Sequence, residues 1–168
     1  PREARATTVC RRCWGSNFYR RHSAIHSAIN RNHADLLDML ASVMNGIILQ
    51  QWIHAQRLAS AVLSAFPVGP ICTSYSPEEA NALLDSGSMA ILAGDSGCPF
   101  FTTDTTASLR ALEIGAKTLR KATRVDGVFD RDPQKDNTAV KFDVLDFKTA
   151  ISEGLEIIDA TAFALCRE

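Results

Sequence analysis

The sequence predicts an α/β fold in which helices cover both faces of a mainly parallel sheet. Short apolar runs of strand length alternate with longer segments whose apolar residues recur at helical spacing. Glycine and proline separate these segments where the pattern changes. Because strands that alternate with helices usually form parallel sheets, we expect a buried sheet between two helical layers.

The first half of the chain supplies two helices and two strands. A helix is predicted for residues 33–51, and its apolar stripe at 36–48 is expected in the core, with a subunit interface as an open alternative. Part of 58–66 is expected to be a buried strand. A second helix begins with the Ser76 cap and Pro77 and ends at Gly87. Residues 89–93 form the next predicted strand.

The second half is predicted to continue the same alternation. A helix covers 102–115, a strand 118–122, and a loop 125–133. Two further helices are expected near 147–153 and 159–168.

The polar residues of 94–132 predict a site that handles phosphate groups. A glycine turn at 94–97 leads to Thr102, Thr103 and Asp104 at a helix start, and Lys121 follows at the end of the next predicted strand. Backbone N–H groups of glycine turns and helix N-termini attract anions. In parallel sheets, ligands bind beyond the carboxyl ends of the strands, where both segments fall.

Composition limits the function classes. The 168 residues suit one domain, and a net charge of −1 gives no global field toward nucleic acid or membranes. We find no apolar run of transmembrane length and no signal peptide. Five cysteines without a regular framework favour a reducing cytoplasm. Residues 1–32 are rich in arginine and are expected to form a divergent, disordered basic leader, before a domain at 33–168.

Four ordered blocks, at 32–46, 98–116, 119–133 and 155–168, resemble the bacterial uridylate kinases of the amino acid kinase family. The resemblance implies a three-layer αβα sandwich that transfers the γ-phosphoryl group of ATP to UMP with Mg²⁺. It also implies a cytoplasmic homo-oligomer, a hexamer in the family, that acts in pyrimidine nucleotide biosynthesis.

The resemblance also implies site residues, carried over one position at a time. Those for UMP are Gly15, Asp35, Ser96, Gly97, Cys98, Pro99, Phe100, Phe101, Thr102 and Thr103. Those for ATP are Ser16, Arg20, Thr123, Phe129 and Asp132. Asp104 and Asp159 match aspartates tied to activity in the family, where they would orient lysines or hold Mg²⁺. Physical reasoning adds Lys121 as a positive group near the transferred phosphate.

Structural interpretations of these residues remain open at this point. Asp35 could be a surface acid, Asp104 an early-helix acid, and Asp159 a helix cap. Lys121 could be an exposed lysine. Of the Phe100 and Phe101 pair, we expect one ring to pack inward and one to shape the nucleotide pocket.

Several departures from the family predict an impaired kinase. The family's first strand, which ends in Lys-Leu-Ser-Gly, and its last strand have no match here, so the chain is expected to be truncated at both ends. Ser16 and Arg21 stand where glycines are expected, and Cys98 replaces an asparagine. A catalytically inactive nucleotide-binding remnant is therefore an alternative. Another is an amino acid kinase that acts on a carboxylate or carbamate.

Two other features of the leader carry weaker hypotheses. Cys10, Cys13, His22 and His26 superficially suggest zinc, but their spacing is short for a zinc finger and chance is favoured. The arginines could bind RNA or DNA, although a solvated arm is the default expectation.

Overall fold

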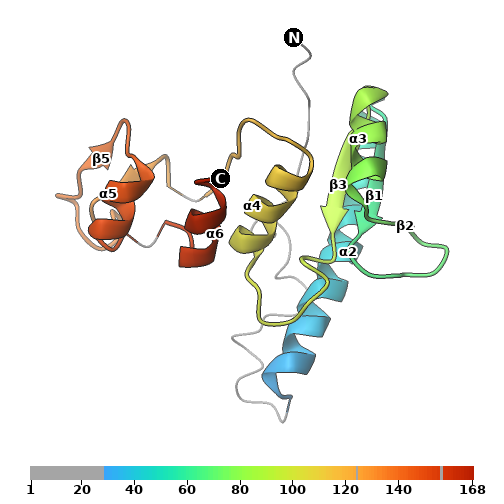
Figure 1. Ribbon diagram of the computed structural model, residues 1–168, viewed down its shortest axis with the longest axis horizontal. Coiled ribbons are helices and arrows are strands. Elements are labelled where there is room, and N and C mark those ends of the chain that lie inside the picture. The colour runs from blue at the N-terminus through green and yellow to red at the C-terminus, as the bar shows by residue number, and fades with distance from the viewer. Residues whose placement is uncertain (1–28, 124, 156) are drawn as a thin grey trace.

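The computed structural model of the chain describes residues 29–123, 125–155 and 157–168 (Figure 1). Its parallel sheet is built from β1 (Ser60–Ser64), β2 (Thr73–Ser74) and β3 (Met89–Ala93). The strand order is β2-β1-β3, and β1 and β3 pair along their whole length, from Ser60 opposite Met89 to Ser64 opposite Ala93. The predicted parallel pairing is therefore confirmed.

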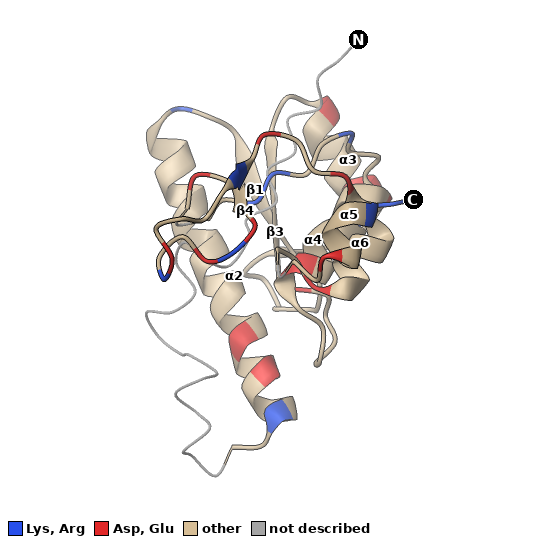
Figure 2. Cartoon of the chain, turned by 90° about the vertical axis from the view of Figure 1, so that its left-hand side faces the viewer, with Lys and Arg blue, Asp and Glu red and all other residues tan. Residues whose placement is uncertain are grey.

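Two helices enclose this sheet. Figure 2 shows the strands between α2 (Arg31–Ala55) and α3 (Pro77–Asp85). Gly46 lets α2 approach closely, since a Cβ at this position would lie 3.3 Å from Val62 Cγ1 and 3.4 Å from Ile91 Cγ2. On α3, Ala80 is fully buried. The main core cluster therefore joins α2 to the sheet, and its members are Val43, Ile53, Val62, Ile91 and Ala93.

The remaining helices lie beside the sheet. α4 (Thr103–Glu113) packs against α6 (Ala160–Leu165), and α5 (Phe147–Ser152) lies beyond α6 (Figure 1). The rings of Phe147 and Phe163 join α5 to α6 edge to face, with 5.9 Å between their centroids. An antiparallel pair of short strands, β4 (Val128–Phe129) and β5 (Lys141–Phe142), completes the described elements.

A polar side chain caps the start of each described helix. The caps of α2, α3, α4, α5 and α6 are Asn30, Ser76, Thr102, Asp146 and Asp159. Each accepts a hydrogen bond from a backbone N–H of the first turn, which satisfies one of the donors that a helix start leaves open. The serine cap and Gly87, which has a φ of +81°, confirm the predicted limits of α3.

Predictions for two segments, residues 118–122 and 36–48, were wrong in whole or in part. Residues 118–122 do not form a strand, because no other described strand pairs with them and an extended segment without a partner makes no ladder. The stripe at 36–48 is only partly core. Val43 is buried, but the exposed fractions of the leucines and Met44 lie between 38% and 46%.

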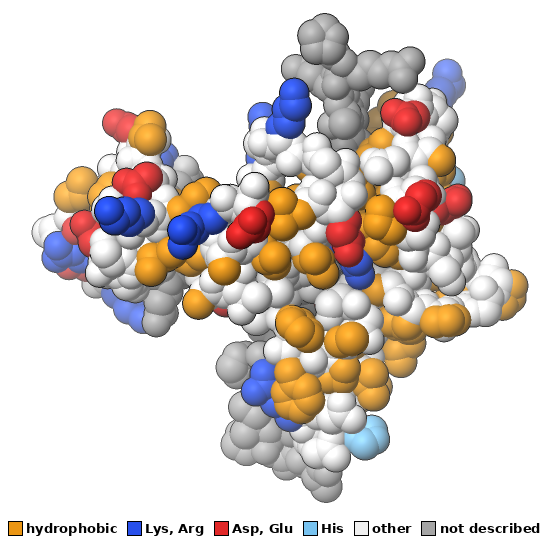
Figure 3. Space-filling view, viewed as in Figure 1, with side chains coloured by type: hydrophobic (Ala, Val, Ile, Leu, Met, Phe, Trp, Pro, Cys, Tyr) orange, Lys and Arg blue, Asp and Glu red, His pale blue; other side chains and the backbone are white. Residues whose placement is uncertain are grey.

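The long helix α2 exceeds what we expected from the sequence in both length and apolar character. By length and composition alone it could cross a membrane, contrary to our expectation. However, its buried face includes Asp35 and Asp38 and packs on β1 and β3, and a core helix meets the same criteria. Figure 3 shows hydrophobic side chains gathered on the surface where α2 lies.

Candidate functional site

The glycine turn after β3 is held by close contacts on two sides. The Gly94 N–H donates to Ser42 Oγ of α2 at 2.8 Å. Gly94 has a φ of +82°, and a Cβ there would lie 2.9 Å from the Phe66 ring and 3.0 Å from the Ala65 nitrogen. Gly97 has a φ of +81° and would place a Cβ 3.0 Å from the Ala65 oxygen. Both positions therefore require glycine for conformation and for space.

Asp35 ties the next part of the loop to α2. Its carboxylate is 6% exposed and accepts a hydrogen bond from the Phe100 N–H at 2.8 Å. The Arg31 Nε lies 3.7 Å from the same carboxylate, and the guanidinium lies 5.0 Å from the centre of the Phe100 ring. Asp35 is therefore a buried acceptor for the loop backbone and not a surface acid.

The loop itself presents its side chains to solvent. Phe100 and Phe101 are 59% and 54% exposed, so the expectation that one ring packs inward was wrong. The reason is local, because Phe100 adopts a φ of +72° when its N–H turns toward Asp35. Ser96 closes the turn by accepting from the Cys98 N–H at 3.1 Å and donating to the Cys98 oxygen at 2.9 Å.

Lys121 and Asp104 form an ion pair at the first turn of α4. The Lys121 ammonium lies 2.7 Å from Asp104 Oδ2 and 2.7 Å from the Ile157 carbonyl oxygen. Both side chains are less than a quarter exposed, at 23% and 22%. An ammonium group has three N–H donors, so these two bonds leave one donor for a ligand.

Asp159 joins the starts of α4 and α6. Its carboxylate accepts hydrogen bonds from the hydroxyls of Thr102 and Thr105, the latter at 2.8 Å, and from the Ala162 N–H at 3.0 Å. Burial raises the pKa of Asp159, but these hydrogen bonds outweigh it and hold the pKa below its ordinary value. Asp159 is thus both a helix cap and a link between two helices.

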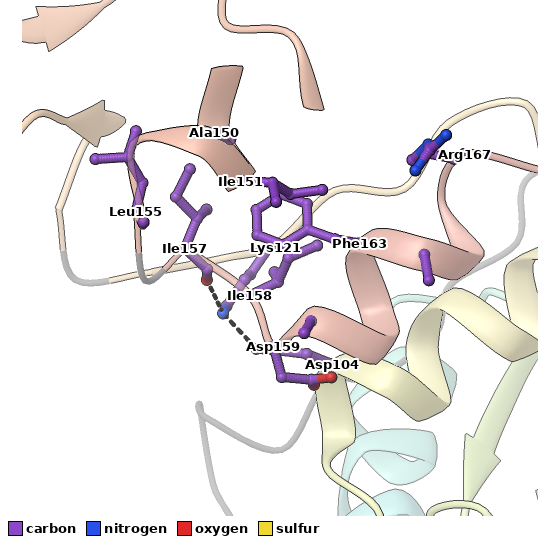
Figure 4. Close-up of a pocket in the computed structure, with 13 residues that line it drawn as sticks. Asp104, Lys121, Ala150, Ile151, Leu155, Ile157, Ile158, Asp159, Phe163 and Arg167 are labelled. Atoms are coloured by element: carbon purple, nitrogen blue, oxygen red, sulfur yellow. Dashed lines mark hydrogen bonds and ion pairs between the residues drawn. The ribbon is translucent and has the colours of Figure 1, made fainter. Parts of the chain in front are cut away.

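A cavity of about 650 Å³ opens beside these residues (Figure 4). Asp104, Lys121 and Asp159 lie on its wall, and the Lys121 ammonium bridges Asp104 and Ile157 in this view. Arg167 adds a second cation to the lining. The other described lining residues are mostly apolar and come from α5, α6 and the segment between them.

The expected ATP residues are not part of this cavity wall. Thr123, Phe129 and Asp132 lie after Lys121, in or near the β4–β5 pair, and none lines the cavity. The Thr123 hydroxyl donates to the Val125 oxygen at 2.6 Å, and Asp132 accepts from the Gln134 N–H at 2.9 Å. The structure therefore brings Asp104, Lys121 and Asp159 together but does not join them to the three expected ATP residues.

Several expected site residues cannot be placed. Gly15, Ser16, Arg20 and the four candidate zinc ligands Cys10, Cys13, His22 and His26 lie outside the described residues. Within the described ranges, no group of three or more His, Cys, Asp or Glu side chains could hold a metal ion.

Three contributors to the site were missed in the sequence. Ser42 holds the glycine turn, Thr105 holds Asp159, and Ile157 supplies a backbone oxygen to Lys121. The position of Thr105 could have been noticed in the sequence, because it is the third residue after the Thr102 cap and its N–H donates to that cap. Ser42 and Ile157 carried none, since a serine inside a helix and a backbone carbonyl have no distinctive pattern.

A family comparison identifies the chain. The model of the amino acid kinase family matches residues 8–168, which is most of the chain. The chain belongs to the amino acid kinase family. Our recognition of this family from the four blocks, and the αβα fold it implied, are therefore confirmed.

Similar sequences in the amino acid kinase family include uridylate kinases. The uridylate kinase of Rhodopseudomonas palustris is 44% identical over 154 residues, which is 92% of this chain and 65% of that protein. The uridylate kinase of Wolbachia pipientis is 39% identical over 160 residues, or 95% and 65% of the two lengths. The chain thus spans slightly less than two thirds of the length of these relatives.

Solved structures of the family show the same fold. The UMP kinase from Ureaplasma parvum superimposes with a TM-score of 0.85 at 31% identity, over 91% of this chain and 66% of that one. The UMP kinase from Bacillus anthracis gives a TM-score of 0.86 at 28% identity, over 91% and 64% of the two chains.

Proposed function

We propose that this chain is a nucleoside monophosphate kinase domain that transfers the γ-phosphoryl group of ATP to UMP and yields UDP. The names of its relatives support this assignment. The observation that carries it is the Lys121 ammonium at the first turn of α4, held by Asp104 and Ile157 with one donor left over.

The UMP phosphate would sit at the start of α4. α4 is an 11-residue helix, and the N-terminus of such a helix attracts anions through the backbone N–H groups of its first turn. Within the described part of the chain, the Thr103 hydroxyl makes no hydrogen bond, so it is available to a phosphate oxygen. Ser96 to Phe101 would enclose the nucleoside, and Asp35 would hold the ribose once its bond to Phe100 is shared or released.

Phosphoryl transfer in this site would depend on position and charge. The acceptor phosphate is already an anion, so no general base is required. Lys121 would use its third N–H to neutralise charge that builds up on the transferred group. Because Asp104 fixes the Lys121 ammonium at 2.7 Å, it would orient the lysine before substrate arrives.

ATP would bind through Thr123, Phe129 and Asp132, together with Ser16 and Arg20, whereas Gly15 would face the UMP phosphate. Mg²⁺ fits only as an ion held mainly by nucleotide phosphates. It usually needs one or two carboxylates beside phosphates and water, and the described residues offer Asp104 and Asp159 on one cavity wall without a third metal-ligating side chain. When bound, Mg²⁺ would neutralise phosphate charge.

We further propose a cytoplasmic homo-oligomer that acts in pyrimidine nucleotide biosynthesis.

Nucleotide binding without phosphoryl transfer is the second candidate. It is favoured by the ion pair itself, because Asp104 already neutralises the lysine that would have to stabilise the transferred group. An acceptor carboxylate or carbamate is less well supported, since the relatives are named for uridylate.

Two assays on the 168-residue chain separate these possibilities. Release of ADP in a coupled assay that requires both UMP and ATP supports the kinase. Binding of UMP by isothermal titration without ADP release supports the binding module. AMP serves as the control nucleotide. If UMP, like AMP, gives neither a heat of binding nor ADP release, the proposed function is wrong.

A further inference from the structure

The starts of α4 and α6 share a single carboxylate. Asp159 caps α6 by accepting from the Ala162 N–H at 3.0 Å, and it also accepts hydrogen bonds from the hydroxyls of Thr102 and Thr105 at the start of α4. Thr102 in turn caps α4, because its hydroxyl oxygen accepts from the Thr105 N–H at 3.1 Å. The two caps are therefore connected by hydrogen bonds between side chains.

Thr105 is the buried member of this group. It is 5% exposed, and its hydroxyl lies 2.8 Å from Asp159 Oδ1 and 3.3 Å from the Thr102 oxygen. A hydrogen bond to a carboxylate in a partly buried setting contributes more than one between neutral groups. Removal of the Thr105 hydroxyl would leave Asp159 with fewer donors, although its burial is unchanged.

We infer that Thr105 is a positioning residue, which holds Asp159 and thereby fixes the first turn of α4 in the geometry that the nucleotide site requires. It touches neither substrate in the proposed site. Its action passes through Asp159 and Thr102 to Thr103 and Asp104, the next two residues along the chain. This inference rests on the proposed function for its effect on UMP, but the connection between α4 and α6 is independent of that function.

Threonine neighbours allow matched variants. Thr105→Val keeps the shape and removes the hydroxyl, whereas Thr105→Ser keeps the hydroxyl. Thr106→Val is the control, because Thr106 is similarly buried, at 7%, but its hydroxyl donates to the Thr102 backbone oxygen at 2.9 Å instead of Asp159. A role limited to helix packing would affect Thr105→Val and Thr106→Val equally.

The first readout is the affinity for UMP, measured by isothermal titration. We expect Kd to rise about tenfold in Thr105→Val, which corresponds to one hydrogen bond to a charged group, and less than about twofold in the other two variants. Equal losses in Thr105→Val and Thr106→Val, or no loss in Thr105→Val, would overturn the inference.

The second readout does not depend on nucleotide. Amide hydrogen exchange at Ala162 should accelerate in Thr105→Val and not in Thr106→Val, because the shared carboxylate loses its fixed position. If Thr105→Val does not fold, Thr105→Ser must still protect Ala162 as the unchanged chain does, and loss of that protection contradicts the inference. Absence of UMP binding in the unchanged chain, with Ala162 exchange altered as expected, contradicts only the proposed function.

Discussion

Replacement of Gly94 by alanine should destabilise the chain by more than its backbone conformation alone requires. The φ of +82° costs an alanine about 1–2 kcal/mol. The added Cβ would also lie 2.9 Å from Phe66 Cε1 and 3.0 Å from the Ala65 nitrogen, distances that force a neighbour to move. Overpacking of this kind costs about 1–3 kcal/mol, so the expected total is about 2–5 kcal/mol.

Gly87→Ala is the matched control for this variant. Gly87 has nearly the same φ, +81°, but a Cβ there meets no atom within 4 Å. We expect a loss of about 1–2 kcal/mol from conformation alone. Urea unfolding of both variants gives the comparison, as the difference between their free energies of unfolding.

The expected difference between the two variants is about 1–3 kcal/mol, with Gly94→Ala the less stable. Equal destabilisation would refute the claim that the turn is held tightly against β1 by Ala65 and Phe66. A Gly94→Ala chain as stable as the unchanged one would also contradict the positive φ.

Three further perturbations test other contacts of the site. Asp35→Ala should speed amide exchange and proteolysis in the 98–101 loop, whereas Asp35→Asn, which keeps an acceptor, should change both less; equal rates in the two variants would contradict the tether. Lys121→Met should lower the free energy of unfolding by about 1–2 kcal/mol because a partly buried carboxylate loses its partner. Lys135→Met, at a side chain 84% exposed, should change it by less than about 0.5 kcal/mol, and similar losses would exclude a special role for the first pair. The lowered pKa of Asp159 predicts stabilisation that is complete above its ordinary value of 3.8 and lost as pH falls through the lower folded value. Acid unfolding should therefore be flatter in Asp159→Asn, and an unchanged acid limb would count against the shared carboxylate.

The elements with strong local signals were predictable from the sequence. Ser76, Pro77 and Gly87 mark both limits of α3, and Thr102 marks the start of α4. These residues act on neighbouring backbone groups, so their effect does not depend on distant parts of the fold. The parallel pairing also followed, because strands and helices alternate along the chain.

The failures came from features that depend on distant partners. Residues 118–122 have a strand-like composition, but a strand needs a neighbour, and the described sheet ends at β3 on one side. The apolar stripe on α2 has helical spacing, which predicts a helix. Whether other elements cover the stripe depends on the rest of the fold and cannot be read from the α2 sequence. The exposed positions of Leu40 and Met44, at 45% and 46%, show this directly.

The candidate site was predictable in its residues but not in its connections. Asp104, Lys121 and Asp159 were all expected, and the structure places them on one cavity wall. Their pairing was not, because the bonds from Lys121 to Ile157 and from Thr105 to Asp159 span 36 and 54 residues of sequence. Physical chemistry of single residues specifies what a side chain can bind, while the fold decides which partner it meets.

The most direct test of the nucleotide site is a titration of the ¹⁵N-labelled chain with UMP, followed by amide chemical shifts. The largest changes are expected at residues 94–104 and at Lys121, with smaller ones along the β4–β5 pair. Saturable shifts confined to other parts of the chain, or none at millimolar UMP, would contradict the assignment of the α4 start as the place where the acceptor phosphate binds.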